Sequence, residues 1–362
     1  MNITIGFIGL GLIGGSIAKS LKKADSSIQI IAYNRSRQPL INAHEEGIVD
    51  EIAYEIDDTF MKCDVVILCT PVEYISMYLE KISEHIKEDC ILTDVGSVKG
   101  YIHKTVSELH LDKNFIGGHP MAGSEKTGYD ASSDILLQNA YYAITPTNET
   151  CQDSIDLLIS LVRMTGAIPI VCKPDIHDYA VAGISHVPHL IASGLVNMVH
   201  DNDTDDELMK TLAAGGFKDI TRIASSSAEM WSQICYTNKE QISLVLDKYI
   251  KYLTETKNMI DSGDREGIFK MFSDSKEYRD SIGINNGPII RNYTLFCDIE
   301  DKEGALSNIT LLLSNNHINI KNIEIIHNRE YSDGVLQISF YDELSRTAAR
   351  NVLTENGYII HR

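Results

Sequence analysis

Residues 3–16 read ITIGFIGLGLIGGS, and this stretch decides the fold of the first part of the chain. The short, apolar, β-branched run at 3–8 predicts a buried strand, and a helical pattern continues beyond the glycines that follow it. Those glycines have the spacing G-x-G-x-x-G, which a dinucleotide-binding unit needs between its first strand and its first helix. The order strand, glycine turn, helix therefore predicts a βαβ unit that binds a dinucleotide, with a purely structural turn as the weaker alternative.

Each glycine of this motif has a physical task. Gly9 permits a tight turn, Gly11 lets the backbone approach a pyrophosphate, and Gly14 lets the helix pack close to the strand. The free N–H groups at the N-terminus of the helix attract the anion. The motif positions expected to bind the cofactor are Gly9, Gly11, Leu12, Ile13 and Gly14.

Apolar strand patterns then alternate with helical patterns up to about residue 173. We expect strands at 28–33, 64–69, 91–93, 140–144 and 168–171, and helices between them, such as 72–86 and 151–166. Strands that alternate with helices form a parallel sheet with helices on both faces. We therefore predict an α/β domain over residues 1–173, with the doubly wound sheet of a Rossmann-type fold.

Long apolar helices are expected over residues 174–284. The segment 176–200 is apolar almost all round, so it must be covered by its own domain or by a second subunit. Pro188 lies inside this segment and removes a hydrogen bond to the carbonyl of Ile184, which predicts a kink. We expect an all-helical substrate and dimerisation domain, and hence a homodimer.

The end of the chain has the pattern of a separate small domain. A breaker-rich segment, SIGINNGP at 281–288, precedes it and predicts a linker. The rest of the chain predicts the order βαββαβ, with strands from Tyr293 to Ile299, at 318–327, around Leu336–Phe340 and at Tyr358–Ile360, and helices at 305–316 and 343–355. Residues 290–362 are therefore expected to form a compact ferredoxin-like domain.

Composition and charge exclude several classes of protein. The chain has 362 residues, 43% of them hydrophobic and 23% charged, which suits a folded protein with a sizeable core. Its formal net charge is −19 and it has no local basic patch, so we expect no nucleic-acid partner. Its 7 cysteines are scattered and show no metal-binding spacing, so we expect buried thiols and no metal. We find no membrane-spanning apolar run and no signal sequence, and expect a cytoplasmic protein without a membrane partner.

The end of the second predicted strand bears on the choice between NAD and NADP. It reads Tyr-Asn-Arg-Ser-Arg, and Asn34 stands where an acid would bind the adenosine ribose of NAD. The following Arg35 and Arg37 can pair with a 2′-phosphate. We expect NAD or NADP as the cofactor and predict that NADP is accepted; two solvated arginines beside bound NAD are the alternative.

A histidine flanked by glycines is the candidate catalytic group. The stretch GGHPMAGSEK at 117–126 places His119 in a loop expected near the strand ends, where glycine neighbours permit close approach to a ligand. A second polar loop, DVGSVK at 94–99, follows a strand, and its Ser97 is suited to orient that histidine. A histidine with a purely structural role is the alternative.

Two further segments hold candidate substrate contacts. SHVPH at 185–189 places two histidines on one helix face, where hydrogen-bonded core histidines, substrate contacts and a less favoured metal pair are all open. GGFKDITRI at 215–223 is a basic cluster in which Arg222 either binds a carboxylate or lies in a surface loop. Trp231, the only tryptophan, either lines the pocket or packs in the core.

Taken together, these motifs resemble the prephenate dehydrogenase family of tyrosine biosynthesis. The matching stretches are GLGLIGGS at 9–16, DVGSVK at 94–99, GGHPMAGSEKTG at 117–128, SHVPH at 185–189 and GGFKDITRIA at 215–224. Residues 290–362 resemble an ACT domain, a regulatory βαββαβ module, through Asp298, Asp301, Gly304 and Leu306 at the first strand–helix turn.

The resemblance implies the NAD(P)-dependent oxidative decarboxylation of prephenate to 4-hydroxyphenylpyruvate. It implies that His119 takes the proton of the ring C4 hydroxyl and that Ser97 bonds the same hydroxyl or His119. It also implies that Arg222 pairs with a substrate carboxylate, that His189 is a second substrate contact, and that Glu125 is a gating acid near Arg222.

Cations and a cofactor loop complete the implied site. Prephenate carries two carboxylates, so an acidic protein needs focused positive charge to bind it, and Lys126 and Lys218 fall within the site motifs. Lys218 stands where the family has its first arginine, and Trp231 is placed to line the pocket. Thr70 and Pro71 resemble the loop that passes beside the cofactor.

The ACT resemblance implies L-tyrosine, the end product of the pathway, as an inhibitory effector. The turn from Asp301 to Gly304 leads to a helix N-terminus that can take the carboxylate of an effector. Asn315 and Asn319, near the end of that helix, can hold its amino group across a paired interface. A dimerisation module without a ligand and competition at the catalytic site are the alternatives.

Three other interpretations of the whole chain stay open. Arogenate, which has an amine where prephenate has a keto oxygen, is an alternative substrate. A 3-hydroxyacid dehydrogenase or an imine reductase is another enzyme on the same frame. An amino-acid sensor with an inert dinucleotide domain is an alternative from a different class.

Overall fold

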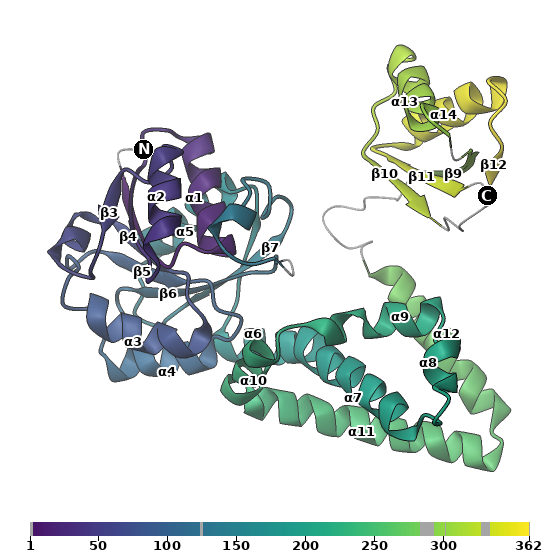
Figure 1. Cartoon of the computed structure of the whole chain (residues 1–362), viewed down its shortest axis with the longest axis horizontal. Coiled ribbons are helices and arrows are strands. Elements are labelled where there is room, and N and C mark those ends of the chain that lie inside the picture. Colours follow the sequence, from purple (N-terminus) through teal and green to yellow (C-terminus); the bar gives the residue numbers. More distant parts are fainter. Residues whose placement is uncertain (1–2, 124–125, 283–292, 301, 327–333, 362) are drawn as a thin grey trace. The chain divides into compact units, whose positions relative to one another are not determined.

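The computed structural model describes residues 3–361 except 124–125, 283–292, 301 and 327–333, and it divides into two compact units, Met1–Leu253 and Thr254–Arg362 (Figure 1). Two predicted site residues, Glu125 and Asp301, lie outside the described residues. The expected division into three domains, at 1–173, 174–284 and 290–362, stays a prediction.

An eight-stranded sheet forms the framework of the first unit. Its strands are β1 (Thr4–Ile8), β2 (Gln29–Tyr33), β3 (Glu51–Ala53), β4 (Val65–Leu68), β5 (Ile91–Asp94), β6 (Phe115–Pro120), β7 (Tyr141–Pro146) and β8 (Ile168–Val171). They lie in the order β3-β2-β1-β4-β5-β6-β7-β8, and the first six are parallel. This order of six strands is that of a doubly wound dinucleotide-binding sheet. The predicted Rossmann-type fold is therefore confirmed.

One end of the sheet departs from the all-parallel prediction, because β7 runs antiparallel to β6. A parallel neighbour needs a long crossover, usually a helix. The connection from Pro120 to Tyr141 has no α-helix among its described residues, only the short 3-10 turn Tyr129–Ala131. Strand β6 itself is not evident from the sequence, because its residues FIGGHP include two glycines and a proline, which are rare in strands.

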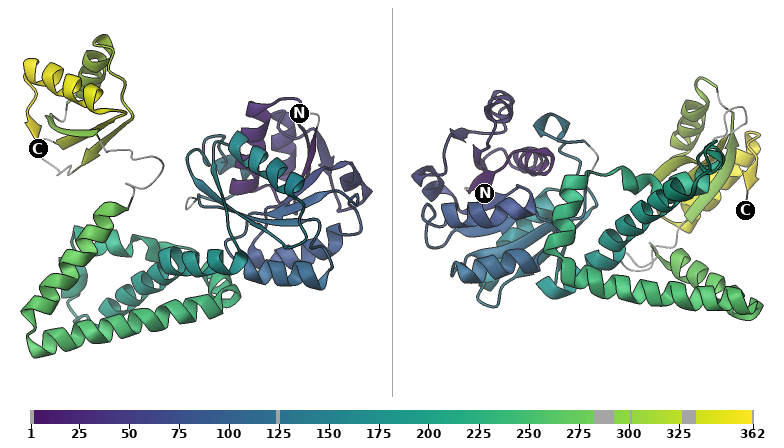
Figure 2. Two further views of the ribbon diagram at one scale, coloured as in Figure 1. Left: turned by 180° about the vertical axis from the view of Figure 1, so that it is seen from behind. Right: turned by 60° about the horizontal axis from the view of Figure 1, so that its bottom comes forward.

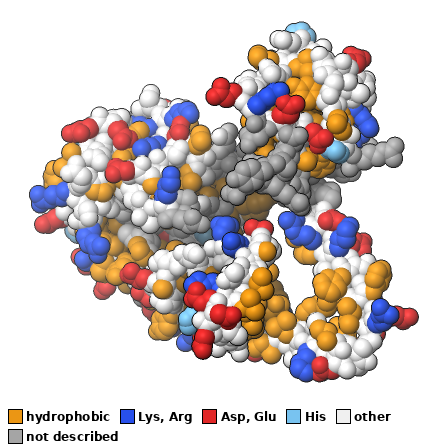
Figure 3. Space-filling view, turned by 45° about the vertical axis from the view of Figure 1, so that its right-hand side comes forward, with side chains coloured by type: hydrophobic (Ala, Val, Ile, Leu, Met, Phe, Trp, Pro, Cys, Tyr) orange, Lys and Arg blue, Asp and Glu red, His pale blue; other side chains and the backbone are white. Residues whose placement is uncertain are grey.

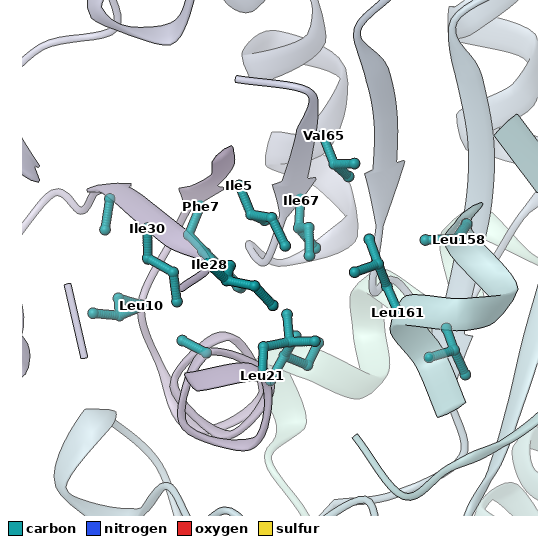
Figure 4. Close-up of a cluster of buried hydrophobic side chains, with 14 of the residues drawn as sticks. Ile5, Phe7, Leu10, Leu21, Ile28, Ile30, Val65, Ile67, Leu158 and Leu161 are labelled. Carbon is teal, nitrogen blue, oxygen red and sulfur yellow. The ribbon is translucent and has the colours of Figure 1, made fainter. Parts of the chain in front are cut away.

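Helices cover both faces of the sheet, as predicted. α1 (Leu12–Ala24), α2 (Arg37–Glu45) and α5 (Gln152–Met164) pack on one face, and α3 (Val72–Ile82) and α4 (Gly100–Glu108) on the other (Figures 1 and 2). Figure 4 shows the core on the first face, where Leu21 and Leu161 lie near the side chains of Ile5 and Ile67. Strands that are buried on both faces read as continuous apolar runs, which made most of them visible in the sequence.

Helices make up the rest of this unit, and one of them contains a π-helical turn. The elements are α6 (Pro174–Val181), the π turn Ala182–His186, α7 (Val187–Asn202), α8 (Leu208–Leu212), α9 (Gly215–Thr221), a 3-10 turn (Arg222–Ser225), α10 (Ala228–Thr237) and α11 (Lys239–Ser262), which continues into the second unit. The N–H of Val187 bonds the carbonyl of Ala182, five residues earlier. Because Pro188 has no N–H to offer Ile184, the irregularity expected there takes this form.

The apolar segment from Pro174 to Asn202 is long and apolar enough to span a membrane by length and composition, which corrects our expectation that no run would be. Only 28% of its most apolar window is buried within the chain. Ile176 and Ile184 are 58% and 70% exposed, and apolar side chains also lie on the surface shown in Figure 3. A helix that is covered by a second subunit has the same composition, so this one helix is weak evidence for a membrane.

The second unit contains α12 (Arg265–Ser281) and a four-stranded antiparallel sheet with two helices. The elements of this sheet domain are β9 (Tyr293–Ile299), α13 (Ala305–Asn315), β10 (Asn322–Ile326), β11 (Gly334–Phe340), α14 (Glu343–Glu355) and β12 (Ile360–His361), and the strand order is β10-β11-β9-β12. The predicted βαββαβ order is confirmed. Apolar residues from both helices and from the strands β9, β11 and β12 form one core between helices and sheet.

Candidate active site

The glycine turn lies where the direction of strand addition changes. β1 lies between β2 and β4, so the loops after β1 and β4 diverge and leave a crevice at the carboxyl ends of the strands. A Cβ on Gly9 would lie 2.6 Å from the carbonyl oxygen of Cys69, and one on Gly14 would lie 2.5 Å from that of Gly9. These two glycines are therefore required by packing within the protein.

Gly11 differs from its two neighbours in the motif. It precedes the first turn of α1, which begins at Leu12 and Ile13, and a Cβ there would meet no atom of the described residues within 4 Å. The space beside it is open at a helix N-terminus, where N–H groups and the helix dipole attract an anion. The turn therefore fits the pyrophosphate of a dinucleotide, and a side chain at Gly11 would occupy part of that space.

Residues on neighbouring loops complete this cradle. Thr70 contacts the Gly9 turn, and its buried hydroxyl has no hydrogen-bond partner among the described residues. Pro71 follows and precedes α3. The Oδ1 atom of Asn34 accepts a hydrogen bond of 3.0 Å from the N–H of Leu10, so this side chain helps to hold the glycine turn.

The two arginines after Asn34 lie at the surface. Arg35 is exposed, and the guanidinium of Arg37 stacks over the ring of Tyr54 at 5.2 Å from its centroid. A guanidinium held in this way is suited to pair with a phosphate. The arrangement is compatible with either NAD or NADP.

His119 lies on strand β6, next to its last residue, and not in a loop as predicted. Its Nδ1 atom is 2.8 Å from Nε2 of His177, and Nδ1 of His177 is 2.8 Å from Oδ1 of Asp178. Desolvation of the ring, followed by the charges of His177, Lys99 and His186, holds the pKa of His119 well below its usual value of 6.5. His119 is therefore a neutral imidazole at neutral pH.

A buried ion pair holds the backbone beside His119. The ammonium group of Lys99 bonds the carboxylate of Asp94 and the carbonyl of Gly118, and both charged side chains are fully buried. Asp94 in turn accepts hydrogen bonds from the N–H groups of Gly118 and Gly96, at 3.0 and 2.7 Å. Because removing one partner leaves the other charge buried and unpaired, this pair locks the end of β6 onto the loop after β5.

Ser97 lies in that loop, but among the described residues it makes no hydrogen bond to His119. The imidazole Nδ1 bonds His177 instead. The direct contact of Ser97 with a substrate hydroxyl stays a prediction.

The two histidines of the SHVPH segment have different environments. His189 donates from Nδ1 to the carbonyl of Ser185 at 2.9 Å and stacks on Trp231, with ring centroids 3.7 Å apart. The Nε1 atom of Trp231 is buried without a partner among the described residues, as expected where a ligand would accept its hydrogen bond. His186 is buried and bonds Asn238, and burial lowers its pKa to about 4. His186 is thus a core residue, while His189 faces the Trp231 ring.

The predicted cations lie at the surface. Arg222 begins the 3-10 turn that packs against α7, the helix of His189, and it is exposed. Lys218 on α9 and Lys126 after β6 are exposed as well. His119 thus contacts His177 on α6, and α6 leads through the π turn into α7. The turn that begins at Arg222 packs against α7. Within the described residues no three His, Cys, Asp or Glu side chains converge to hold a metal ion.

Sequence reasoning missed the partners that surround His119. His177, Asp178, Lys99, Asp94 and Asn238 were not selected, although the adjacent pair His177-Asp178 at the start of an apolar helix was a signal. A carboxylate and a histidine are rarely buried in an apolar segment unless they bond each other or a third group.

Comparisons with known proteins agree with this geometry. Residues 17–171 match the family model described as prephenate dehydrogenase, nucleotide-binding domain, and residues 173–274 match prephenate dehydrogenase, dimerization domain. The chain is 36% identical to prephenate dehydrogenase of Bacillus subtilis over 98% of its own length and 96% of the relative's.

Two solved structures have a similar fold. Prephenate dehydrogenase of A. aeolicus, solved with hydroxyphenyl propionate and NAD+, is 33% identical, covers 77% of this chain and 98% of its own, and superposes with a TM-score of 0.73. Synechocystis arogenate dehydrogenase is 30% identical, covers 77% of this chain and 100% of its own, and has a TM-score of 0.72.

Proposed function

The chain belongs to the prephenate dehydrogenase family, and we propose that it oxidises and decarboxylates prephenate to 4-hydroxyphenylpyruvate with NAD or NADP as hydride acceptor. The observation that carries this proposal is the neutral imidazole of His119, held at the end of the sheet that also bears the glycine turn. A neutral imidazole next to a cofactor site is suited to accept a proton from a hydroxyl group while hydride leaves the same carbon.

The cofactor supplies the hydride-accepting nicotinamide, and the protein supplies binding and orientation. The glycine turn with the N-terminus of α1 would hold the pyrophosphate, Thr70 and Pro71 would flank it, and Asn34 and Arg35 would face the adenosine ribose. The open space at Gly11 and the unpartnered hydroxyl of Thr70 are the two structural features that support this assignment.

The substrate would lie between His119 and the α7 helix. His119 would accept the proton of the C4 hydroxyl at Nε2, because Nδ1 already bonds His177. His189, stacked on Trp231, and Arg222 would bind carboxylates of the substrate, and Lys126 and Lys218 would add positive charge in this acidic protein. Glu125 and Ser97 keep the roles that the family resemblance implies.

His119→Asn tests the proton acceptor. The variant should retain cofactor binding, because the glycine turn is untouched, and should lose turnover by roughly 10²–10⁴-fold, the usual contribution of a positioned acid–base group. The measurement is kcat for NADH or NADPH formation with prephenate, together with the dissociation constant of the cofactor.

The pH profile of the unaltered enzyme gives a second readout. Because burial lowers the pKa of His119, the acid limb of kcat/KM should fall below pH 6.5, and the enzyme should stay active at neutral pH.

A kcat of His119→Asn within about threefold of the unaltered enzyme would remove the assignment of His119 as proton acceptor.

Arogenate is the second candidate substrate. The 30% identity and the TM-score of 0.72 with Synechocystis arogenate dehydrogenase favour testing it. The two substrates differ only at the side chain, away from the ring hydroxyl, so His119 would act on both in the same way. Assays with prephenate and arogenate side by side, at matched concentrations, decide between them by kcat/KM.

A homodimer in the cytoplasm, with residues 290–362 as a tyrosine-binding ACT domain, completes the proposal. The match of residues 173–274 to a dimerization domain and the exposed apolar side chains of α6 and α7 support the dimer. The βαββαβ order supports the ACT assignment. Gly304, in the left-handed region at φ +81°, precedes α13, while Asn315 ends that helix and Asn319 is exposed beyond it.

A further inference from the structure

A chain of hydrogen bonds connects the carboxylate of Asp178 to the imidazole of His119. Asp178 accepts from the backbone N–H of Lys99 at 2.8 Å and of Gly100 at 2.7 Å, which caps the start of α4. The same carboxylate lies 2.8 Å from Nδ1 of His177, whose Nε2 lies 2.8 Å from Nδ1 of His119. Every member of this chain except His119 is buried.

The donor at each link follows from the chemistry of Asp178. An ionised carboxylate only accepts hydrogen bonds, so Nδ1 of His177 must carry the proton of that link. The Nε2 atom of a neutral His177 then has a lone pair and accepts, so Nδ1 of His119 must carry a proton and donate. The remaining nitrogen of His119, Nε2, is left without a proton.

We propose that His177 and Asp178 are positioning residues that hold His119 in the tautomer with its proton on Nδ1 and its lone pair on Nε2. This inference rests on the proposed function, in which Nε2 accepts the proton of the substrate hydroxyl. Without the hydrogen bonds from His119 through His177 to Asp178, the two neutral tautomers of His119 would compete. The tautomer with its proton on Nε2 is unable to accept a proton at that nitrogen.

The same hydrogen bonds also stabilise the positive charge that His119 gains when it accepts a proton. A protonated His119 would donate from Nδ1 to His177 in a charge-assisted hydrogen bond, with the anion of Asp178 behind it. The charged and titratable groups that face His119 are Lys99, which opposes that charge, and His177 and His186. Lys99 is itself paired with Asp94, so Asp178 is the carboxylate that bonds the two histidines, through its contact with His177.

Three variants of the full chain separate positioning from simple packing. In Asp178→Asn, the amide oxygen can still accept from a backbone N–H group at the start of α4. The NH₂ group donates toward Nδ1 of His177, which reverses the tautomers of His177 and His119. His177→Gln keeps an acceptor toward His119 and a donor toward Asp178, whereas His177→Leu removes both. The matched control is His103→Gln, which replaces a half-buried histidine on α4 that bonds Thr145 and not His119.

Two measurements are made on each variant. The first is kcat and KM with prephenate and saturating cofactor; the second is the tautomer of His119 from long-range ¹H–¹⁵N correlation spectra of ¹⁵N-histidine-labelled protein, assigned with His119→Asn. We expect Asp178→Asn and His177→Leu to lower kcat by roughly 10²–10⁴-fold with KM within about threefold, and His177→Gln to lose less. The spectra should show protonated Nδ1 in the unaltered protein and protonated Nε2 in Asp178→Asn.

Two results would overturn the proposal. One is a His119 that carries its proton on Nε2 in the unaltered protein. The other is an Asp178→Asn or His177→Leu protein that is folded by circular dichroism and retains both the tautomer and the kcat, or loses no more than His103→Gln does. The tautomer is measured without substrate, so it stays decisive even if neither prephenate nor arogenate is oxidised, a result that would contradict the proposed function alone.

Discussion

At the scale of single residues, the choice of cofactor depends on the side chains that follow β2. Asn34 is neutral and is bonded to the glycine turn and to the carbonyl of Ser36, so it does not repel a 2′-phosphate. Arg35 is exposed, and Arg37 is held over Tyr54. We expect kcat/KM with NADP to lie within about tenfold of that with NAD, because no acid here repels the 2′-phosphate and the two arginines can attract it.

Asn34→Asp is the matched variant for this prediction. The aspartate keeps the oxygen that accepts from Leu10, so the fold of the glycine turn should persist; it adds a negative charge and loses the exposed hydrogen bond that Nδ2 donates to Ser36. Use of NADP should fall by roughly tenfold or more while use of NAD is maintained, since like charges in contact cost several kcal/mol. Strict use of NAD by the unaltered enzyme would contradict the charge argument.

Arg222 is the second residue whose role a single substitution tests. If its guanidinium binds a substrate carboxylate, Arg222→Ala should raise KM for prephenate by about ten- to a hundredfold, since a hydrogen bond to a charged group is worth roughly 1.5–3 kcal/mol. Arg163→Ala, at an exposed position on α5, is the control and should leave KM unchanged. An unaltered KM in Arg222→Ala would place this arginine outside the site.

At the scale of one element, the glycine turn before α1 separates binding from packing. Within the part of the chain that the structure describes, a Cβ at Gly11 meets no atom within 4 Å, whereas a Cβ at Gly14 lies 2.5 Å from the carbonyl oxygen of Gly9. Gly11→Ala should therefore leave the free energy of unfolding unchanged and raise the Kd for the cofactor by roughly tenfold or more, which is about 1.4 kcal/mol. Gly14→Ala should instead lower the free energy of unfolding by about 1–3 kcal/mol, because the backbone must shift.

Urea unfolding and cofactor titration of both variants check this prediction. Gly194→Ala, on helix α7, is the control for added volume, because a Cβ there also meets no atom of the described residues within 4 Å. If Gly11→Ala binds the cofactor as tightly as the unaltered protein, the pyrophosphate does not lie against this turn.

At the scale of the whole molecule, the question is how the C-terminal sheet domain, expected over residues 290–362, affects catalysis. We expect L-tyrosine to inhibit by binding this domain, and to bind the less active conformation more tightly by roughly 1–3 kcal/mol of coupling. Truncation after Asn286 should abolish inhibition and keep dehydrogenase activity. Unchanged inhibition of the truncated enzyme would place tyrosine at the catalytic site, where it resembles the product.

The sequence alone determined the elements whose information is local. The G-x-G-x-x-G turn, the buried apolar strands and the βαββαβ end of the chain are each written in consecutive residues, so periodicity and turn chemistry predicted them. Strand β6 was missed because its information is not local. FIGGHP has no strand pattern, and these residues form a strand because they pair with β5 on one side and β7 on the other, with Gly118 also held by Asp94 and Lys99.

Only the tertiary structure decided the partners of His119. His177 lies 58 residues further along the chain, and it meets His119 because helix α6 packs beside the end of the sheet. Hydrogen bonds between distant segments leave no period in the sequence, and the direction of β7 depends on a connection without a helix. The sequence therefore singled out His119 as the candidate catalytic histidine by its glycine neighbours, while only the fold brought His177 and the carboxylate of Asp178 to it.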